Sequence, residues 1–340
     1  MVTMAVLARH EQDSPLGAKV AHSADAAGTR TPSDVGSALA IPASDLRQHA
    51  FHSRLGRFQA KRLLPCLPAP DWIESVRSDS DTSIEEGLFV EGERQTIGDR
   101  TADVPTSPEA FVRWFESLRE SGPGQSDALF PWLSADASLS EMTWFVGQEA
   151  GGEAGFDDLV ALTQVRLPTR AKLEMARNYW DEMGRGNERG MHGGMLTVLV
   201  DELALNPSAE TTVWESLALS NLMVALASNR RYAYHAVGAL GVVELTAPDR
   251  VASVNEGLKR LGLSKRARMY FQLHATLDIH HSKAWNREVI APLIESNASA
   301  ARAIAEGALM RLASGARCFQ RYRRQFSRLA SSEIPSRPRS

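Results

Sequence analysis

The chain has 340 residues, a formal net charge of −3 and a hydrophobic content of 43%, which is ordinary for a soluble globular protein. This balance gives no general attraction to nucleic acid or to an anionic membrane. Cys66 and Cys318 are too far apart for a thiolate zinc motif or a disulfide framework. No apolar run of about 18 residues occurs, so we expect a cytoplasmic protein with neither a membrane partner nor a nucleic-acid partner.

The first 106 residues divide into a polar tail and a helical extension. Residues 1–40 are rich in Ala, Ser, Gly and Thr without a sustained apolar period, which predicts a disordered tail. Residues 41–106 form the extension, in which Ala40 to Leu67 has a helical pattern that ends near Pro65. Residues 87–98 are interpreted as a short hairpin or only a loop.

Residues 107–330 predict one all-α domain, followed by a flexible C-terminus at 331–340. Neither alternating β-branched strands nor repeats of fixed period occur there. Its basic end (Arg317, Arg321, Arg323, Arg324 and Arg328) fits a solvated helix face better than a nucleic-acid site. The predicted helical stretches lie near 107–121, 139–165, 169–185, 190–204, 209–228, 231–246, 250–261, 264–291 and 293–329.

Three candidate metal ligands share one face of the predicted helix 264–291. His274, Asp278 and His281 have i, i+4, i+7 spacing, and at about 100° per residue they fall within roughly 60° of one another. The neighbouring Leu, Phe, Ile and Trp indicate a buried helix, where such groups are costly to bury without a partner. Two imidazoles and a carboxylate suit iron, manganese or zinc. His280 faces elsewhere, as an outer neighbour of the site or a bystander.

Other acidic and histidine positions extend this candidate set. Glu182 and His192 lie ten residues apart across a glycine-containing segment, which would let a helix bend or unwind between them. Glu244 ends an apolar helical run, where a solvent-facing side chain is the alternative. Glu149 follows another apolar segment, and Glu153, one turn later, competes with it for any role.

Together these residues resemble the haem-oxygenase-like diiron oxidases and oxygenases, often labelled iron-containing redox enzymes. The similarity covers roughly residues 139 to 292 and is strongest in 179–196 and 271–292. In that family one helix gives a Glu and a His, a second gives a Glu, and a third gives an H-x-x-x-D/E-x-x-H set. The resemblance implies a haem-oxygenase-like helical bundle that holds two iron ions through six ligands: Glu182, His192, Glu244, His274, Asp278 and His281.

The resemblance also implies a chemistry. Members that oxygenate an amine nitrogen carry an extra carboxylate ligand on the preceding helix, and Glu149 stands where it is expected, with Glu153 as the alternative. We therefore expect a non-haem diiron oxygenase that uses O2 and an external electron donor to N-oxygenate a small amino-acid-like substrate in specialised metabolism. Arg177, Arg185 and Arg189 could hold a substrate carboxylate, although solvated surface charges are the plainer interpretation.

Two alternative functions stay open from the sequence. The same diiron centre could carry out oxidative C–C fragmentation, decarboxylation or desaturation, since these reactions differ by substrate pose rather than by ligands. The chain could also be a non-catalytic helical binding protein with incidental histidines. Haem is not expected, because His49 and His52 lack a comparable signature, and no fingerprint for flavin, nicotinamide or ATP is present. The substrate identity and the oligomeric state, with a homodimer as one option, stay open.

Overall fold

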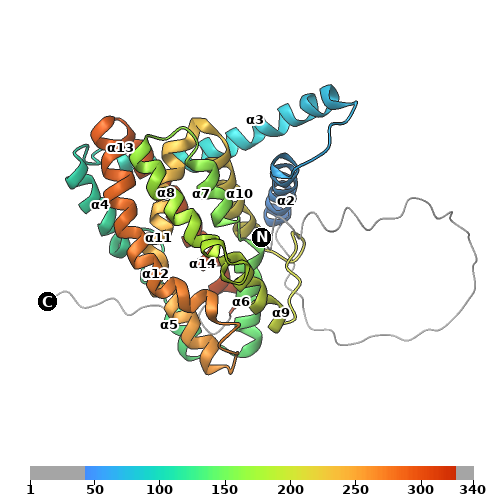
Figure 1. The fold of residues 1–340 in the computed structure, drawn as a ribbon. Coiled ribbons are helices and arrows are strands. Elements are labelled where there is room, and N and C mark those ends of the chain that lie inside the picture. Colours follow the sequence, from blue (N-terminus) through green and yellow to red (C-terminus); the bar gives the residue numbers. More distant parts are fainter. Residues whose placement is uncertain (1–42, 327–340) are drawn as a thin grey trace, which may run out of the picture.

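The computed structural model describes residues 43–326, so the tail predicted at 1–40 and the end predicted at 331–340 lie outside the described residues. Within that range the chain is helical without a strand, which confirms the all-α prediction (Figure 1). None of these helices is long and apolar enough to cross a membrane. The α-helices are α2 (Ala43–Leu63), α3 (Trp72–Ile97), α4 (Pro108–Ser121), α5 (Leu129–Ala135), α6 (Leu139–Gly151), α7 (Phe156–Thr163), α8 (Thr169–Glu182), α9 (His192–Glu202), α10 (Trp214–Ser228), α11 (Ala233–Arg260), α12 (Met269–Trp285), α13 (Ala291–Ser296) and α14 (Ala300–Gln325).

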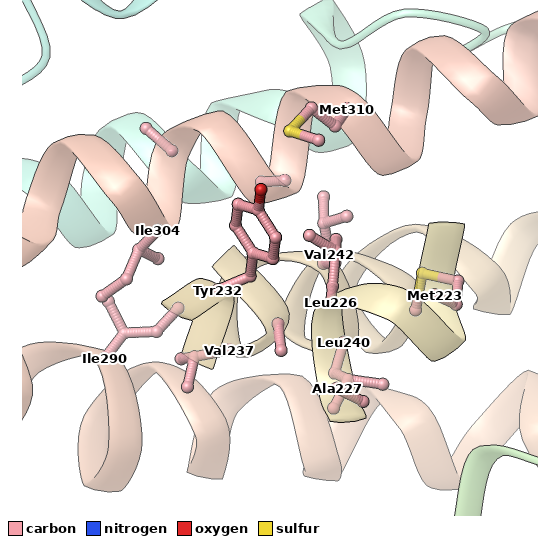
Figure 2. Packing of buried hydrophobic residues seen from close by; sticks show 14 of the residues in the cluster. Met223, Leu226, Ala227, Tyr232, Val237, Leu240, Val242, Ile290, Ile304 and Met310 are labelled. Atoms are coloured by element: carbon pink, nitrogen blue, oxygen red, sulfur yellow. The ribbon is translucent and has the colours of Figure 1, made fainter. Parts of the chain in front are cut away.

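The core lies around α10 and α11. Helix α10 is buried on nearly all sides, as expected for a helix with apolar residues all round. Helix α11 packs along both α14 and α12. Figure 2 shows Leu226 of α10, Leu240 of α11 and Ile304 of α14 in one apolar cluster. Removing this apolar surface from water, at about 25 cal/mol per Å², is the main term that stabilises the bundle.

Helices α11 and α14 cross so closely that both need glycine. A Cβ atom on Gly238 would lie 1.8 Å from the carbonyl oxygen of Ile304. A Cβ atom on Gly307 would lie 1.9 Å from the carbonyl oxygen of His235. Because both contacts are with backbone, no side-chain rotation can relieve them. The crossing therefore fixes α11, which carries one of the predicted ligands, against the last helix.

Gly238→Ala is expected to destabilise the fold by about 1–3 kcal/mol or more, because overpacking here forces the two backbones apart. The free energy of unfolding from urea titration measures this. Gly87→Ala in α3 is the matched control, since nothing lies within 4 Å of its Cβ position. That change should be neutral or stabilising by up to about 1 kcal/mol. Equal effects of the two substitutions would contradict the close-crossing argument.

The hairpin or loop predicted at 87–98 is wrong, because most of this segment is the second half of α3. Val90 and Ile97 are buried in the main apolar cluster. Their burial outweighs the cost of two glycines inside the helix, which is about 1 kcal/mol each relative to alanine. The local sequence pattern of this segment is ambiguous, and its packing against the core determines that it is helical.

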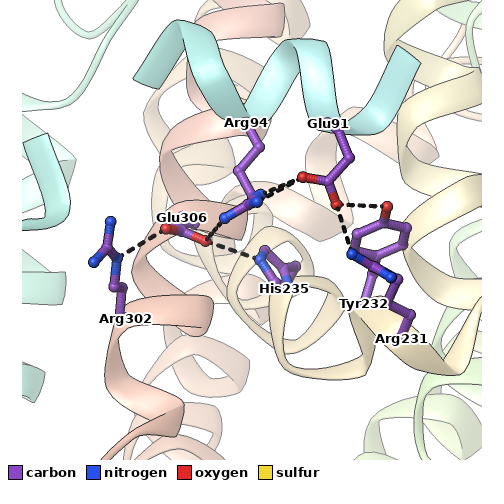
Figure 3. A network of polar contacts seen from close by, with 7 residues as sticks. All are labelled: Glu91, Arg94, Arg231, Tyr232, His235, Arg302 and Glu306. Carbon is purple, nitrogen blue, oxygen red and sulfur yellow. Dashed lines mark hydrogen bonds and ion pairs between the residues drawn. The ribbon is translucent and has the colours of Figure 1, made fainter. Parts of the chain in front are cut away.

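A network of polar contacts fastens α3 to α11 and α14 (Figure 3). The carboxylate of Glu306 lies 3.0 Å from His235 Nε2 and 3.6 Å from Arg94 Nη1. Glu91 accepts hydrogen bonds from Arg94 and from the hydroxyl of Tyr232, the latter at 2.9 Å. Charged groups that satisfy one another in this way can be buried at an interface between helices. The second half of α3 is therefore anchored on the bundle.

Several predicted boundaries differ in the structure, among them that of 293–329, which divides between α13 and α14. The stretch 139–165 breaks into α6 and α7, because Gly155 takes a positive φ of 75° and turns the chain. The stretches 231–246 and 250–261 join into α11, which runs through Pro248. Proline lacks an N–H, so the carbonyl of Glu244 loses its helical partner. Packing against α12 and α14 nevertheless keeps the helix continuous.

Candidate metal centre

Four helices bring the six predicted ligands to one cavity of about 100 Å³. All of them except His281 line this cavity, and His281 contacts Glu244 beside it. Their side chains are buried, apart from the half-buried His274. The ligands are Glu182 at the end of α8, His192 at the start of α9, Glu244 in the middle of α11, and His274, Asp278 and His281 on α12.

A glycine turn brings Glu182 next to His192. Between α8 and α9 the chain unwinds into two single 3₁₀ turns, η2 (Gly184–Gly186) and η3 (Glu188–Gly190). Gly184 has a φ of 62°, and a Cβ atom there would lie 2.3 Å from the carbonyl carbon of Gly190. Only glycine fits such a turn without strain. As a result, Glu182 Oε2 lies 2.7 Å from His192 Nδ1.

The ligand atoms form two groups of three that share Glu182. One ligand atom each from Glu182, His192 and His274 lies within 4.8 Å of the others, and the same holds for Glu182, Glu244 and His281. A carboxylate has two oxygens and about four lone-pair directions, so it can contact two cations at once. The geometry is therefore compatible with two adjacent metal ions that share one carboxylate.

Several buried atoms of the cluster have no hydrogen-bond partner among residues 43–326. His192 Nδ1 lies close to Glu182, and His281 Nδ1 lies 3.5 Å from Glu244 Oε2, yet neither pair is aligned for a hydrogen bond. Asp278 Oδ1 is also unpartnered. Each such atom costs about 1–3 kcal/mol of stability, which a cation between them would offset. Imidazole nitrogens and carboxylate oxygens are a donor set that fits iron.

Hydrogen bonds to residues outside the predicted ligand set orient the imidazoles of His274 and His281. His281 Nε2 donates to Asp181 Oδ2 at 3.1 Å, and Arg185 holds the other oxygen of Asp181 at 2.6 Å. His274 Nδ1 donates to the carbonyl oxygen of Tyr270 at 2.7 Å. Because these contacts occupy the other ring nitrogen, Nδ1 of His281 and Nε2 of His274 are the nitrogens whose lone pairs could bind a metal ion. Metal-binding histidines are typically oriented by such partners.

Glu244 joins α8 to α12. Its Oε1 accepts a hydrogen bond from Asn178 Nδ2 at 2.6 Å, while Oε2 faces His281. Burial disfavours protonation of His281, but the nearby carboxylate of Glu244, the hydrogen bond to Asp181 and the charge of Glu182 outweigh it and raise its pKa to about 9. Glu244 is therefore held in position from two neighbouring helices.

Burial and crowding shift the other pKa values of the cluster. Burial, followed by the charge of Glu244, raises the pKa of Glu182 well above its usual value. Burial and the charges of Glu244 and Glu182 also raise the pKa of Asp278. The pKa values of His192 and His274 fall to about 4, chiefly because both rings are buried. A divalent cation would lower the raised pKa values of the crowded carboxylates and would keep the two imidazoles neutral.

Residues 143–316, slightly more than half of the chain, match the family of iron-containing redox enzymes. The chain belongs to this family. The match runs from α6 into α14 and includes all six predicted ligands, and it confirms the resemblance and the haem-oxygenase-like fold expected from the sequence. A search of curated proteins finds no match. Together with the Glu and His groups, the match supports an iron-dependent oxidoreductase.

In this redox enzyme Glu153 lines the cavity, whereas Glu149 is not among the described residues that line it. Glu153 follows the end of α6, and its Oε1 accepts a hydrogen bond from the backbone N–H of Gly155 at 3.0 Å. Asp157, in the first turn of α7, also lines the cavity. Glu149 instead accepts a hydrogen bond from the hydroxyl of Tyr322 at 3.0 Å. Of the two sequence candidates for an extra carboxylate, Glu153 is the one that faces the cavity.

The arginines considered for a substrate carboxylate lie on the surface of the redox enzyme. Arg177 pairs with Glu174 and Arg185 pairs with Asp181, each at 2.6 Å, and both arginine side chains are mostly exposed. Arg189 is exposed as well. No Lys or Arg is among the described residues that line the cavity. The interpretation of these three as surface charges therefore fits the structure better than a carboxylate clamp.

His49 and His52 belong to α2 and line no part of the metal cavity as described. The ring of His52 is buried, stacks on Trp214 at 6.0 Å between centroids, and lies 3.3 Å from Asn221 Nδ2. Burial, followed by the charges of Arg317 and His49, lowers the pKa of His52 to about 3. His52 is thus a neutral core residue of the redox enzyme.

Acid is expected to destabilise the redox enzyme partly through His52. Its pKa falls from 6.5 to about 3 on folding, so between these values the unfolded chain binds more protons. The stability conferred by neutral His52 is fully present above pH 6.5 and is lost as the pH falls toward 3, by up to about 1.4 kcal/mol per pH unit. His52→Gln should flatten this decline in urea titrations across that pH range. Parallel declines in both proteins would contradict the prediction.

Proposed function

We propose that the chain is a non-haem diiron oxygenase that N-oxygenates a small amine. The observation that carries the proposal is the pair of three-residue groups sharing Glu182 on a cavity rich in carboxylates. Iron bound there would supply O2 activation, with electrons from an external donor. The chain would hold the metals, admit the amine and keep water away.

The proposed ligands would divide between two iron ions. His192 and His274 belong to one group and Glu244 and His281 to the other, with Glu182 common to both. Three carboxylates and three imidazoles suit two ferrous ions and leave positions for oxygen. The complete proposed set is Glu182, His192, Glu244, His274, Asp278 and His281.

The charge of the cavity favours an amine as substrate. Glu153 and Asp157 add two carboxylates to those of the proposed ligands, and the described lining contains neither Lys nor Arg. An ammonium group would be attracted to such a cavity, whereas a substrate carboxylate would find no side-chain cation. This favours N-oxygenation over the alternatives left open by the sequence, which are oxidative C–C fragmentation, decarboxylation and desaturation.

Glu153 is proposed to take the proton that an ammonium must lose before its nitrogen can be oxygenated. Burial raises the pKa of Glu153 above its usual value, which makes the carboxylate a better proton acceptor than an exposed one. Besides Tyr270, the remaining side chains of the wall are apolar and would hold the carbon part of the amine and exclude water. They are Phe156, Leu196, Val243, Ala247 and Val251.

Asp181→Asn is expected to weaken iron binding by about 10–100-fold, because it removes the charge that orients His281 and strengthens it as a donor. Titration with Fe(II) under anaerobic conditions measures this. Asp201→Asn on the exposed side of α9 is the control and should leave the affinity unchanged. Unchanged iron affinity in Asp181→Asn would contradict its role as a positioning residue.

The proposed function is tested by loading the chain with Fe(II) without oxygen and then adding O2, a reductant and a panel of amines. Iron analysis should give about two ions per chain, and mass spectrometry should show amines that gain one or two oxygen atoms. Loss of carbon from the substrate would instead indicate oxidative fragmentation. Absence of iron uptake would favour the non-catalytic binding protein.

A further inference from the structure

Tyr270, in the first turn of α12, lines the metal cavity alongside the predicted ligands. Its backbone carbonyl accepts the hydrogen bond of His274, and the two rings lie 4.4 Å apart between centroids. Its hydroxyl, by contrast, forms no hydrogen bond within residues 43–326. The hydroxyl is not one of the fully enclosed polar atoms, as Asp278 Oδ1 is, so it faces open space.

The open space that this hydroxyl faces is the cavity. Burial, followed by the charges of Glu153 and Glu182, raises the pKa of Tyr270 well above its usual value. The hydroxyl therefore lies deep in the protein, close to carboxylates that themselves line the cavity. A phenol is protonated at neutral pH even at its ordinary pKa of about 10, so this group is a hydrogen-bond donor.

The hydroxyl of Tyr270 supplies a kind of hydrogen bond that the rest of the described wall lacks. Apart from the predicted metal ligands, the polar side chains among the described residues of the lining are Glu153, Asp157 and Tyr270. Ionised carboxylates accept hydrogen bonds but cannot donate them. A ligand that fills the cavity without offering an acceptor would leave the hydroxyl unpaired, which disfavours its binding. The cavity therefore favours a ligand with an acceptor for Tyr270.

The charges of the cavity decide which acceptor fits. Glu153 and Asp157 would attract an ammonium group, but they would repel a carboxylate on the same substrate. The described lining has no Lys or Arg that would offset this repulsion. A neutral oxygen atom, such as that of a hydroxyl group, can accept the hydrogen bond without this cost.

We propose that the hydroxyl of Tyr270 donates a hydrogen bond to a neutral oxygen atom of the substrate, and that the preferred substrates are amino alcohols rather than plain alkylamines or amino acids. The ammonium end of the substrate lies at Glu153 and its hydroxyl end at Tyr270. This inference rests on the proposed function for the amine itself. Tyr270 is then a specificity-determining residue, separate from the six predicted ligands.

Isothermal titration calorimetry without oxygen, on the full chain before and after loading with Fe(II), tests the proposal. The wild type should bind a short amino alcohol about 3–10-fold more tightly than the alkylamine in which a methyl group replaces the hydroxyl. It should bind the amino acid in which a carboxylate replaces the hydroxyl more weakly than the amino alcohol. Tyr270→Phe should abolish the preference over the alkylamine, because phenylalanine keeps the ring beside His274 and the same backbone carbonyl.

Tyr234→Phe is the matched control, because Tyr234 is a partly buried tyrosine of α11 outside the described lining of the cavity. Its substitution should leave the preference for the amino alcohol unchanged. Equal binding of the amino alcohol and the alkylamine by the wild type, or the same preference in Tyr270→Phe, would overturn the proposal. Tightest binding of the amino acid, or no binding of any of the three compounds, would overturn it as well.

The binding measurement separates this proposal from the proposed function, because it requires no turnover. A chain that selects amino alcohols through Tyr270 but oxidises no amine would contradict the proposed function alone. If the amines are oxidised, Tyr270→Phe should raise the KM for the amino alcohol more than the KM for the alkylamine. An equal loss of turnover with both amines and unchanged affinities would assign the hydroxyl to a different step and overturn its role in selecting the substrate.

Discussion

Glu182→Ala is expected to reduce iron content from about two ions per chain to near zero, whereas Glu244→Ala should leave about one. The difference arises because Glu182 belongs to both groups of ligand atoms, while Glu244 belongs to only one. Elemental analysis after anaerobic loading with Fe(II) and gel filtration measures the iron that is retained. Oxidation of any amine should be lost in both variants.

Glu174→Ala is the matched control for this prediction. Glu174 lies on the same helix as Glu182, two turns earlier, and its partner is the surface residue Arg177. Its removal should leave the iron content unchanged. Equal iron loss in Glu182→Ala and Glu244→Ala would show that the two ligand groups do not hold separate ions. Full iron retention in Glu182→Ala would place the site elsewhere.

The α12 ligands could be predicted from the sequence, because their relation depends only on helical periodicity. His274, Asp278 and His281 fall on one side of a helix wherever that helix packs. The structure brings two of them, His274 and His281, into the two groups that share Glu182 and places Asp278 on the same cavity. Their identity as iron ligands remains a prediction.

Other parts of the site depend on backbone geometry that no periodicity reveals. The approach of Glu182 to His192 requires the positive φ of Gly184 and its contact with Gly190, and the sequence predicts only that this segment can bend or unwind. Glu244 looks like a helix end because Pro248 follows it, yet tertiary packing carries α11 through the proline. In each case contacts with distant residues outweigh the local signal.

Which of Glu149 and Glu153 faces the cavity also depends on backbone geometry that the sequence pattern does not reveal. A continuous helix over 139–165 would place both residues on nearly one face, so the sequence cannot separate them. The structure ends α6 at Gly151, and the chain then turns at Gly155, which directs Glu153 to the cavity. Residues Asn178 and Asp181, which contact two predicted ligands, have no sequence signal beyond their position on the helix that ends at Glu182.

Glu153→Gln is expected to raise the KM for a cationic amine by about 10–100-fold, with the iron content unchanged. Glutamine keeps the size and the hydrogen bond to Gly155 but removes the charge that would attract the ammonium and accept its proton. A hydrogen bond to a charged group contributes about 1.5–3 kcal/mol, and each 1.4 kcal/mol corresponds to a tenfold change. Steady-state assays with an amine found in the panel measure the effect.

Glu149→Gln separates this role from that of the neighbouring carboxylate. Because Glu149 bonds to Tyr322 instead of lining the cavity, its substitution should affect stability more than the KM. A larger loss of turnover in Glu149→Gln would favour Glu149 as the extra carboxylate. Loss of iron in Glu153→Gln would make Glu153 a metal ligand rather than a partner of the amine. Since an ammonium needs a carboxylate whose charge is not already used by iron, retained iron together with a raised KM is the result that supports an amine substrate.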